Sequence, residues 1–150
     1  MQFPVPLAVA SSRTTLHEGP FAFEPKYDGW RPAAHGGRRR LHTCSGHDVT
    51  GRFPEIVEAV AELGDVVLDG ELVAAAGLPP RLEFAALQAG PTRRKVRGIG
   101  GYLLAFDVLA ADGQGLRLQP YPQRHARLKD LLESNGLSRV QAVPSTQDRE

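Results

Sequence analysis

One eight-residue segment gathers the residue types needed for covalent chemistry. Residues 24–31 read Glu-Pro-Lys-Tyr-Asp-Gly-Trp-Arg, so a lysine stands between two carboxylates and an arginine follows. In an extended backbone, Glu24, Lys26 and Asp28 fall on the same side. A lysine held in this way is a candidate amine nucleophile, provided that burial, a nearby cation or a bound divalent metal helps it to lose its proton. The alternative is an ion-paired surface lysine in a hairpin.

The rest of the chain must position this segment, and its patterns predict an α+β fold. We expect an extended lead-in over residues 1–20. The expected strands are Phe21–Phe23, Trp30–His35, Arg38–Thr43, Val66–Ala75, Tyr102–Leu109 and Val140–Val143; the expected helices are Pro54–Leu63, Arg81–Gln88 and Gln123–Leu132; the expected loops are Ser45–Arg52 and Gly90–Gly101, and a turn is expected at Asp112-Gly113. Because strands and helices do not alternate strictly, we expect largely antiparallel sheets with flanking helices.

The two most apolar strands carry polar side chains suited to a site. Alternation places Asp69 and Glu71 on one face of their strand. Acids in so apolar a strand cost free energy unless they meet a cation, a metal or a hydrogen-bond donor. In the later strand, alternation places Phe106 and Val108 on one face and Asp107 on the other.

Composition excludes several classes of protein. With 150 residues, 41% hydrophobic and 23% charged, the chain has room for one globular domain. The single cysteine, Cys44, excludes an internal disulfide and a cysteine-based zinc site. No apolar run is long enough for a transmembrane helix, and the first fifteen residues do not resemble a secretory signal. We therefore expect a cytoplasmic protein without a membrane partner.

The net charge and the histidines say little about whether the chain binds nucleic acid or a metal. A net charge of +1 neither demands nor excludes nucleic acid. Arginines 38–40 and the basic residues of 93–97 are candidate contacts to a DNA backbone, or equally solvated surface charge. The five histidines have no spacing typical of a metal site, so we expect them at the surface or in loops.

The segment Glu24–Arg31 resembles motif I of the covalent nucleotidyltransferases, which include ATP-dependent DNA ligases, RNA ligases and mRNA capping enzymes. Asp69–Val73 (Asp-Gly-Glu-Leu-Val) is similar to motif III of that family, and Leu103–Leu109 is similar to motif IIIa. Residues 43–56 resemble a ligase segment whose Phe-Pro-Glu part favours bacterial ATP-dependent DNA ligases, including the ligase domains of end-joining systems. The resemblance implies part of an ATP-grasp-like nucleotidyltransferase (adenylation) domain.

The resemblance also implies a role for each motif residue. Lys26 would attack the α-phosphate of ATP, with Mg²⁺ as cofactor, and become lysyl-AMP, and Asp28 would orient Lys26. The residues implied to bind the nucleotide are Glu24 at the adenine edge, Arg31 at the sugar or phosphates, Glu71 at the ribose or in the metal shell, and Phe106 stacked on the adenine. The AMP would then pass to the 5′-phosphate of nicked duplex DNA, and the nick would be sealed during repair or recombination.

Two departures from the family pattern leave alternatives open. Cys44 stands where relatives have a phosphate-contacting arginine, a role that Arg40 or Arg52 could take over. The chain ends before motifs IV and V and before the C-terminal OB-fold, so we expect residues 1–150 to be a partial adenylation domain. The alternatives are a truncated, inactive relative that binds nucleotide or DNA weakly, and an RNA ligase or capping-type enzyme, against which the Phe-Pro-Glu segment argues. The oligomeric state is left open.

Overall fold

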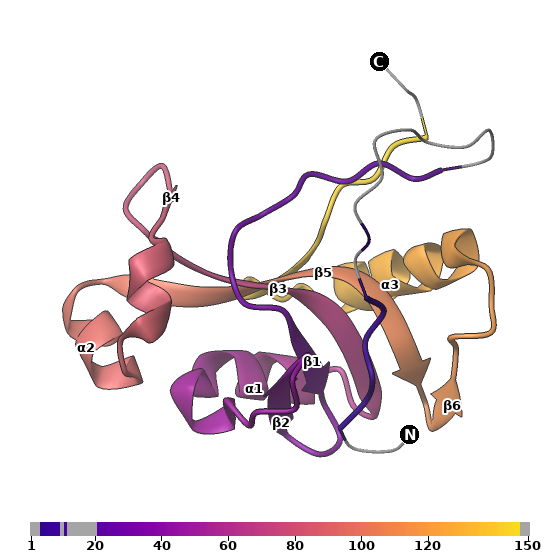
Figure 1. Ribbon diagram of the computed structural model, residues 1–150, viewed down its shortest axis with the longest axis horizontal. Helices are drawn as coiled ribbons and strands as arrows, with labels where there is room; N and C mark the ends of the chain where they lie inside the picture. The colour runs from indigo at the N-terminus through magenta and orange to yellow at the C-terminus, as the bar shows by residue number, and fades with distance from the viewer. Residues whose placement is uncertain (1–3, 10, 12–20, 148–150) are drawn as a thin grey trace.

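The computed structural model describes residues 4–9, 11 and 21–147, so most of the predicted lead-in lies outside the described residues. These residues form an antiparallel sheet with helices around it (Figure 1). The strands are β1 (Pro32–His35), β2 (Arg40–Thr43), β3 (Val66–Ala76), β4 (Arg81–Leu82), β5 (Ile99–Ala111), β6 (Gln114–Gly115) and β7 (Val140–Ala142). The helices are α1 (Pro54–Ala61), α2 (Pro91–Val96) and α3 (Tyr121–Asn135), with 3-10 turns η1 (Thr50–Arg52) and η2 (Phe84–Gln88).

The long strands β3 and β5 form the centre of the sheet. The strand order is β2-β1-β3-β5-β6, with β4 paired to β3 and β7 paired to β5. The named pairs are antiparallel except for β5 and β7. The α+β prediction with largely antiparallel pairing is therefore confirmed.

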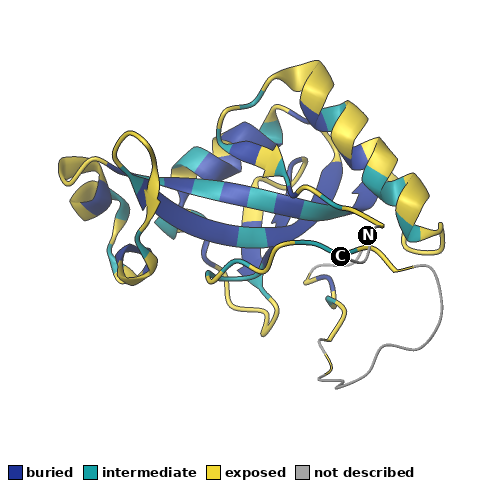
Figure 2. Cartoon of the chain, turned by 90° about the horizontal axis from the view of Figure 1, so that it is seen from above, coloured by how far each residue is buried: buried dark blue, intermediate teal, exposed yellow. Residues whose placement is uncertain are grey.

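Helices α1 and α3 cover one face of this sheet. The main core cluster joins Ile56 and Val60 of α1 and Leu128 of α3 to Leu72 of β3 and Leu103 of β5. Figure 2 shows the central strands largely buried and the outer surface of α3 exposed. A second cluster, on the opposite side, packs Val5 against Val67, Leu109 and Ala110. The remainder of this opposite face is where the motif residues gather.

Strand β5 is irregular beside β3, which corrects one sequence prediction. The register passes from Asp69↔Asp107 to Gly70↔Ala105, so Phe106 is an extra residue on β5, a β-bulge. Because the bulge interrupts alternation, Val108 joins the helix-covered core instead of sharing a face with Phe106. Asp107 pairs with Asp69, and opposite residues of an antiparallel pair share a face.

Three other predictions differ from the structure. Residues 90–101 contain α2 and the start of β5 rather than a loop. Residues 81–88 form β4 and the 3-10 turn η2 rather than one helix. Of the expected strand Phe21–Phe23, only Phe23 pairs, in a single bridge with Thr146. The turn predicted at Asp112-Gly113 is confirmed, since both residues have positive φ values, 51° and 76°, as a two-residue hairpin turn requires. Within the described ranges, no helix is long and apolar enough to cross a membrane.

Two histidines lie inside the hairpin of β1 and β2, contrary to the surface prediction. His35 is 3% exposed and His42 is 1% exposed, with ring centroids 4.9 Å apart. The backbone N–H of Val5 donates to Nε2 of His42 at 3.0 Å. Burial, followed by the neighbouring His42 and Arg38, lowers the pKa of His35 from 6.5 to about 4. In the described part of the chain, no group of three or more histidine, cysteine or acidic residues could hold a metal ion; His17 lies outside it.

The His35 pKa predicts a loss of stability in mild acid. Between pH 6.5 and about 4 the unfolded chain binds a proton that folded His35 does not, so the free energy of unfolding falls as the pH falls through this window. We expect His35 to account for roughly 2–3 kcal/mol of this fall in the free energy of unfolding. His35→Gln should remove that part of the fall. Urea unfolding at pH 7 and pH 4.5 measures it, with His47→Gln at an exposed position as control. If His35→Gln and the unsubstituted chain lose the same stability between pH 7 and pH 4.5, His35 is not the group responsible.

Candidate active site

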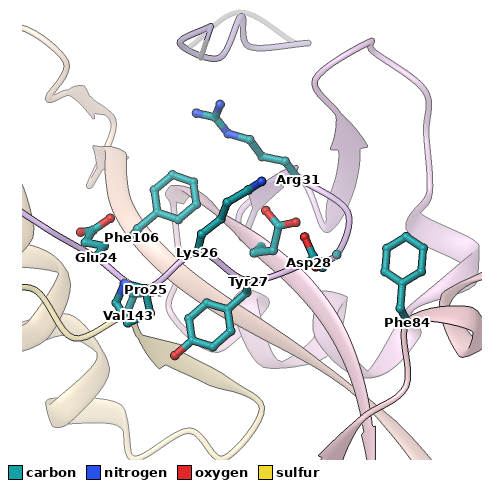
Figure 3. A pocket seen from close by; sticks show the side chains of 11 residues that line it. Glu24, Pro25, Lys26, Tyr27, Asp28, Arg31, Phe84, Phe106 and Val143 are labelled. Atoms are coloured by element: carbon teal, nitrogen blue, oxygen red, sulfur yellow. The ribbon is translucent and has the colours of Figure 1, made fainter. Parts of the chain in front are cut away.

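A pocket of about 910 Å³ opens on the sheet face opposite α1 and α3 (Figure 3). Its lining includes all six predicted site residues: Glu24, Lys26, Asp28, Arg31, Glu71 and Phe106. They come from three separate parts of the chain, namely the motif segment 24–31, strand β3 and strand β5. Pocket-lining residues that the sequence did not indicate include Phe84 and Val143.

Backbone hydrogen bonds hold the motif segment across the sheet. Trp30 and Leu72 exchange two of them, at 3.0 and 2.7 Å, and Phe23 and Thr146 exchange two more, at 2.8 and 3.0 Å. A Cβ on Gly29 would lie 2.2 Å from the carbonyl oxygen of Leu72. Only glycine therefore lets the segment approach β3 this closely.

Lys26 is exposed to the pocket. Figure 3 shows its side chain beside Phe106, with the amino end directed toward Arg31. Lys26 takes part in none of the ion pairs formed among the described residues, so the alternative of an ion-paired surface lysine lacks its partner there. Asp28 is also exposed at the pocket.

Arg31 is fixed by contacts on three sides. Its Nε and one terminal nitrogen donate to the carboxylate of Asp69 at 3.0 and 2.7 Å, and its other terminal nitrogen donates to the carbonyl of Ala8 at 2.7 Å. The guanidinium carbon lies 5.3 Å from the ring centroid of Phe106. The hydrogen bond with Asp69 raises the pKa of Arg31. Arg31 is therefore a permanent positive charge at the pocket, and Asp69 has the cationic partner that its apolar strand demands.

Glu71 is half-buried at the same wall of the pocket. Burial raises the pKa of its carboxyl group, while a hydrogen bond from the backbone N–H of Gly29 and the charge of Arg31 act in the opposite direction. The nearby acids Asp28 and Asp69 raise the pKa further. The pKa of Glu71 is therefore raised, with burial as the main cause.

Glu24 has a partner that the sequence analysis missed. The hydroxyl of Tyr121, at the start of α3, donates to Oε1 of Glu24. The sequence prediction grouped Glu24 with Lys26 and Asp28, and all three line the pocket. The contact with Tyr121 joins residues 97 positions apart, and no local pattern indicates it.

Two arginines that could replace a phosphate-contacting arginine at position 44 have protein partners instead. Arg40 pairs with Asp48, and Arg52 donates to the carbonyls of Leu87 and Gln88. Neither lines the pocket, and Cys44 does not line it either. Cys44 itself is exposed, and it lies close enough to Arg31 to affect the pKa of that guanidinium.

One arginine of the 93–97 cluster is structural, which corrects its proposed contact with DNA. Arg94 is 1% exposed, and its guanidinium carbon lies 4.1 Å from the ring centroid of Phe53. It donates to the carbonyls of Ala89 and Arg52 and lies 3.6 Å from Oε1 of Glu55.

The fold has counterparts among solved structures. The chain is similar to the ligase domain of LigD from M. tuberculosis, with a TM-score of 0.67 and 28% identity, over 83% of this chain and 39% of that one. It is also similar to mycobacterial DNA ligase D complexed with ATP and MES, with a TM-score of 0.66 and 27% identity, over 83% of this chain and 40% of that one. The fold is thus that of a DNA ligase nucleotidyltransferase domain.

Sequence comparison gives the family. The family described as "ATP dependent DNA ligase domain" matches residues 6–150, and the chain belongs to it. The chain is 39% identical over 144 residues to a probable DNA ligase of Streptomyces griseus, covering 86% of this chain and 28% of that protein. It is 32% identical over 137 residues to the multifunctional non-homologous end joining protein LigD of Mycolicibacterium smegmatis, covering 87% of this chain and 17% of that protein. The chain therefore spans less than a third of the length of either relative.

Proposed function

We propose that residues 1–150 are part of the adenylation domain of an ATP-dependent DNA ligase and that Lys26 forms the lysyl-AMP intermediate. The observation that carries this proposal is the convergence of three separated motifs on one pocket, with the exposed amine of Lys26 among them. The alternative of a surface lysine in a hairpin does not explain why Lys26 lies in one pocket with Arg31, Glu71 and Phe106.

The proposed reaction begins with attack by the neutral amine of Lys26 on the α-phosphorus of ATP. A nitrogen–phosphorus bond forms, the bond from the α-phosphorus to the bridging oxygen breaks, and pyrophosphate leaves. Arg31, whose orientation Asp69 fixes, faces the phosphates, and Phe106 offers a half-buried ring to the adenine. Asp28 orients Lys26. Positioning and charge neutralisation supply most of the rate enhancement in a step of this kind.

The acids at the pocket suit Mg²⁺ bound mainly through ATP. Mg²⁺ is commonly held by one or two carboxylates together with substrate phosphates and water. Glu71 supplies such a carboxylate, and the negative charge around it favours a cation. Mg²⁺ bound there would neutralise charge on the phosphates, and its positive field would favour the neutral form of the amine.

For the whole protein we propose transfer of AMP to a 5′-phosphate at a nick in duplex DNA, followed by sealing of the nick. The supporting evidence is the family membership and the likeness to LigD proteins, which are named for non-homologous end joining. The ligand expected at the site is thus ATP, and the substrate of the later steps is nicked DNA.

The test is incubation of the folded chain with α-labelled ATP and Mg²⁺, followed by denaturing electrophoresis and intact-mass measurement. We expect a covalent mass increase of one AMP, with the label retained on denaturation and mapped to the peptide that contains Lys26. GTP labelled in the same way should give little product. A folded chain that binds ATP but takes up no label would contradict the first step in this chain and favour a non-catalytic relative.

A further inference from the structure

The first turn of α3 holds a carboxylate of the nucleotide pocket in place. Tyr121 donates its hydroxyl proton to Oε1 of Glu24. Burial, followed by this hydrogen bond to Glu24, raises the pKa of the Tyr121 phenol, while Ser145 acts in the opposite direction, so the phenol keeps its proton. The hydroxyl of Tyr121 is therefore committed as a donor to Glu24.

The ring of Tyr121 is held as firmly as its hydroxyl. The His125 ring centroid lies 5.5 Å from that of Tyr121, and the guanidinium carbon of Arg124 lies 5.9 Å from the same ring. Arg124 also donates two hydrogen bonds of 2.8 Å to the carboxylate of Asp107. Asp107 directly follows Phe106 on β5, so the helix turn that carries Tyr121 is tied to the strand that carries the pocket's aromatic ring.

We propose that Tyr121 is a positioning residue that orients Glu24 toward the exocyclic amine of adenine and so sets the preference for ATP over GTP. This inference rests on the proposed function of the pocket. It assigns to α3, which lies outside the three motifs, control over which purine the site accepts.

The chemistry of the two groups explains the selectivity. An ionised carboxylate only accepts hydrogen bonds. Adenine has an amine, a donor, at the position where guanine has a carbonyl, an acceptor. With Oε1 occupied by Tyr121, the second oxygen of Glu24 remains for the base. A site built around a fixed acceptor rejects a ligand that presents another acceptor, because neither group finds a donor. A Glu24 side chain released from Tyr121 can rotate away from guanine, so discrimination falls.

Replacement of Tyr121 by Phe removes the hydroxyl and keeps the ring. We expect the Kd for ATP to rise up to about tenfold, because Glu24 is no longer held in place for the adenine amine before the ligand binds, while the Kd for GTP stays within about twofold. The single-turnover rate of lysyl-AMP formation at saturating ATP should change less than about threefold, because the reacting atoms are not touched. Tyr102→Phe, on β5 beside Arg139 rather than in the pocket, is the matched control and should change neither Kd.

Glu24→Gln provides a second and sharper test. Tyr121 requires an acceptor, so it should hold the amide oxygen of the new side chain and turn the amide NH₂ toward the base. We expect the preference to shift toward GTP in this single variant and to disappear in the double variant with Tyr121→Phe, because the amide can then flip. The single variant keeps Tyr121, so its part of the test does not depend on whether a chain with Tyr121→Phe folds.

The outcomes separate the two proposals. Selective loss of ATP affinity in Tyr121→Phe, or a shift toward GTP in Glu24→Gln that disappears in the double variant, supports the positioning role. A shift that persists in the double variant overturns it. Unchanged ATP preference in Tyr121→Phe and in Glu24→Gln overturns that role and leaves the proposed function standing. A purely structural role would weaken ATP and GTP equally, and that result also overturns it. A folded, unsubstituted chain that binds neither nucleotide overturns the proposed function, and the inference with it.

Discussion

Replacement of Lys26 by Ala or by Arg is expected to abolish covalent AMP labelling, a loss of at least about a thousandfold. Alanine removes the amine. Arginine keeps the positive charge, but its guanidinium stays protonated at any ordinary pH and cannot act as an amine nucleophile. The Arg variant therefore distinguishes a nucleophile from a cation that merely attracts phosphate. The measurement is single-turnover labelling with α-labelled ATP and Mg²⁺.

The composition of the chain provides close controls for this prediction. The sequence has three lysines, Lys26, Lys95 and Lys129, and the last two are exposed outside the pocket. Lys95→Ala and Lys129→Ala should label as the unsubstituted chain does. Binding of ATP by Lys26→Ala, within a few-fold of normal, would show that the pocket itself is intact. Label that persists in Lys26→Arg, or that maps to Lys95, would refute the assignment of the nucleophile.

The second large effect concerns stability. Arg94→Ala should lower the free energy of unfolding by about 3 kcal/mol or more. Truncation leaves the carbonyls of Ala89 and Arg52 without their donor, removes the stacking on Phe53, and opens a cavity at a residue that is 1% exposed. For a chain of this size the loss corresponds to a fall of about 10 °C in Tm.

The neighbouring arginine is a matched control. Arg93 is on the same helix and exposed, so Arg93→Ala should change stability by less than about 0.5 kcal/mol. Thermal and urea unfolding of both variants give the comparison. Equal and small effects would mean that the buried guanidinium of Arg94 contributes no more than a surface charge.

The contacts of Arg94 also link the stability of the fold to the candidate active site. The ring of Phe53 meets Trp30 edge-on with centroids 5.9 Å apart, and Trp30 exchanges backbone hydrogen bonds with Leu72 of β3. Arg94 therefore packs against the residue that supports the end of the motif segment. Loss of this support is expected to disturb the position of Lys26 as well as the fold.

Much of the architecture follows from local patterns. The amphipathic helix after Pro54, the apolar strand that became β3 and the Asp112-Gly113 turn depend on neighbouring residues, and the structure confirms them. The need of Asp69 for a cation, a metal or a hydrogen-bond donor was also predictable, because a buried acid in an apolar strand is costly. Arg31 meets this need.

The remaining features depend on contacts between distant residues. Helix α2 is a short basic segment whose anchoring residue, Arg94, is buried through partners far along the chain, so its sequence resembles a loop. The sequence gives no sign of the bulge at Phe106, because the alternation of side chains between the two faces of β5 shifts there without any change in residue composition. Tyr121 and Glu24 meet only after β5 and α3 have packed together.

The bulge at Phe106 separates the requirements of the sheet from those of the site. The pairs Asp69↔Asp107 and Gly70↔Ala105 would be consecutive in a regular ladder, so the hydrogen-bonded framework has no need of the residue between them. A chain that lacked this one residue would keep the strand pairing and lose only the aromatic ring that we propose stacks on the adenine. The fold and the proposed nucleotide binding can thus diverge independently at a single position.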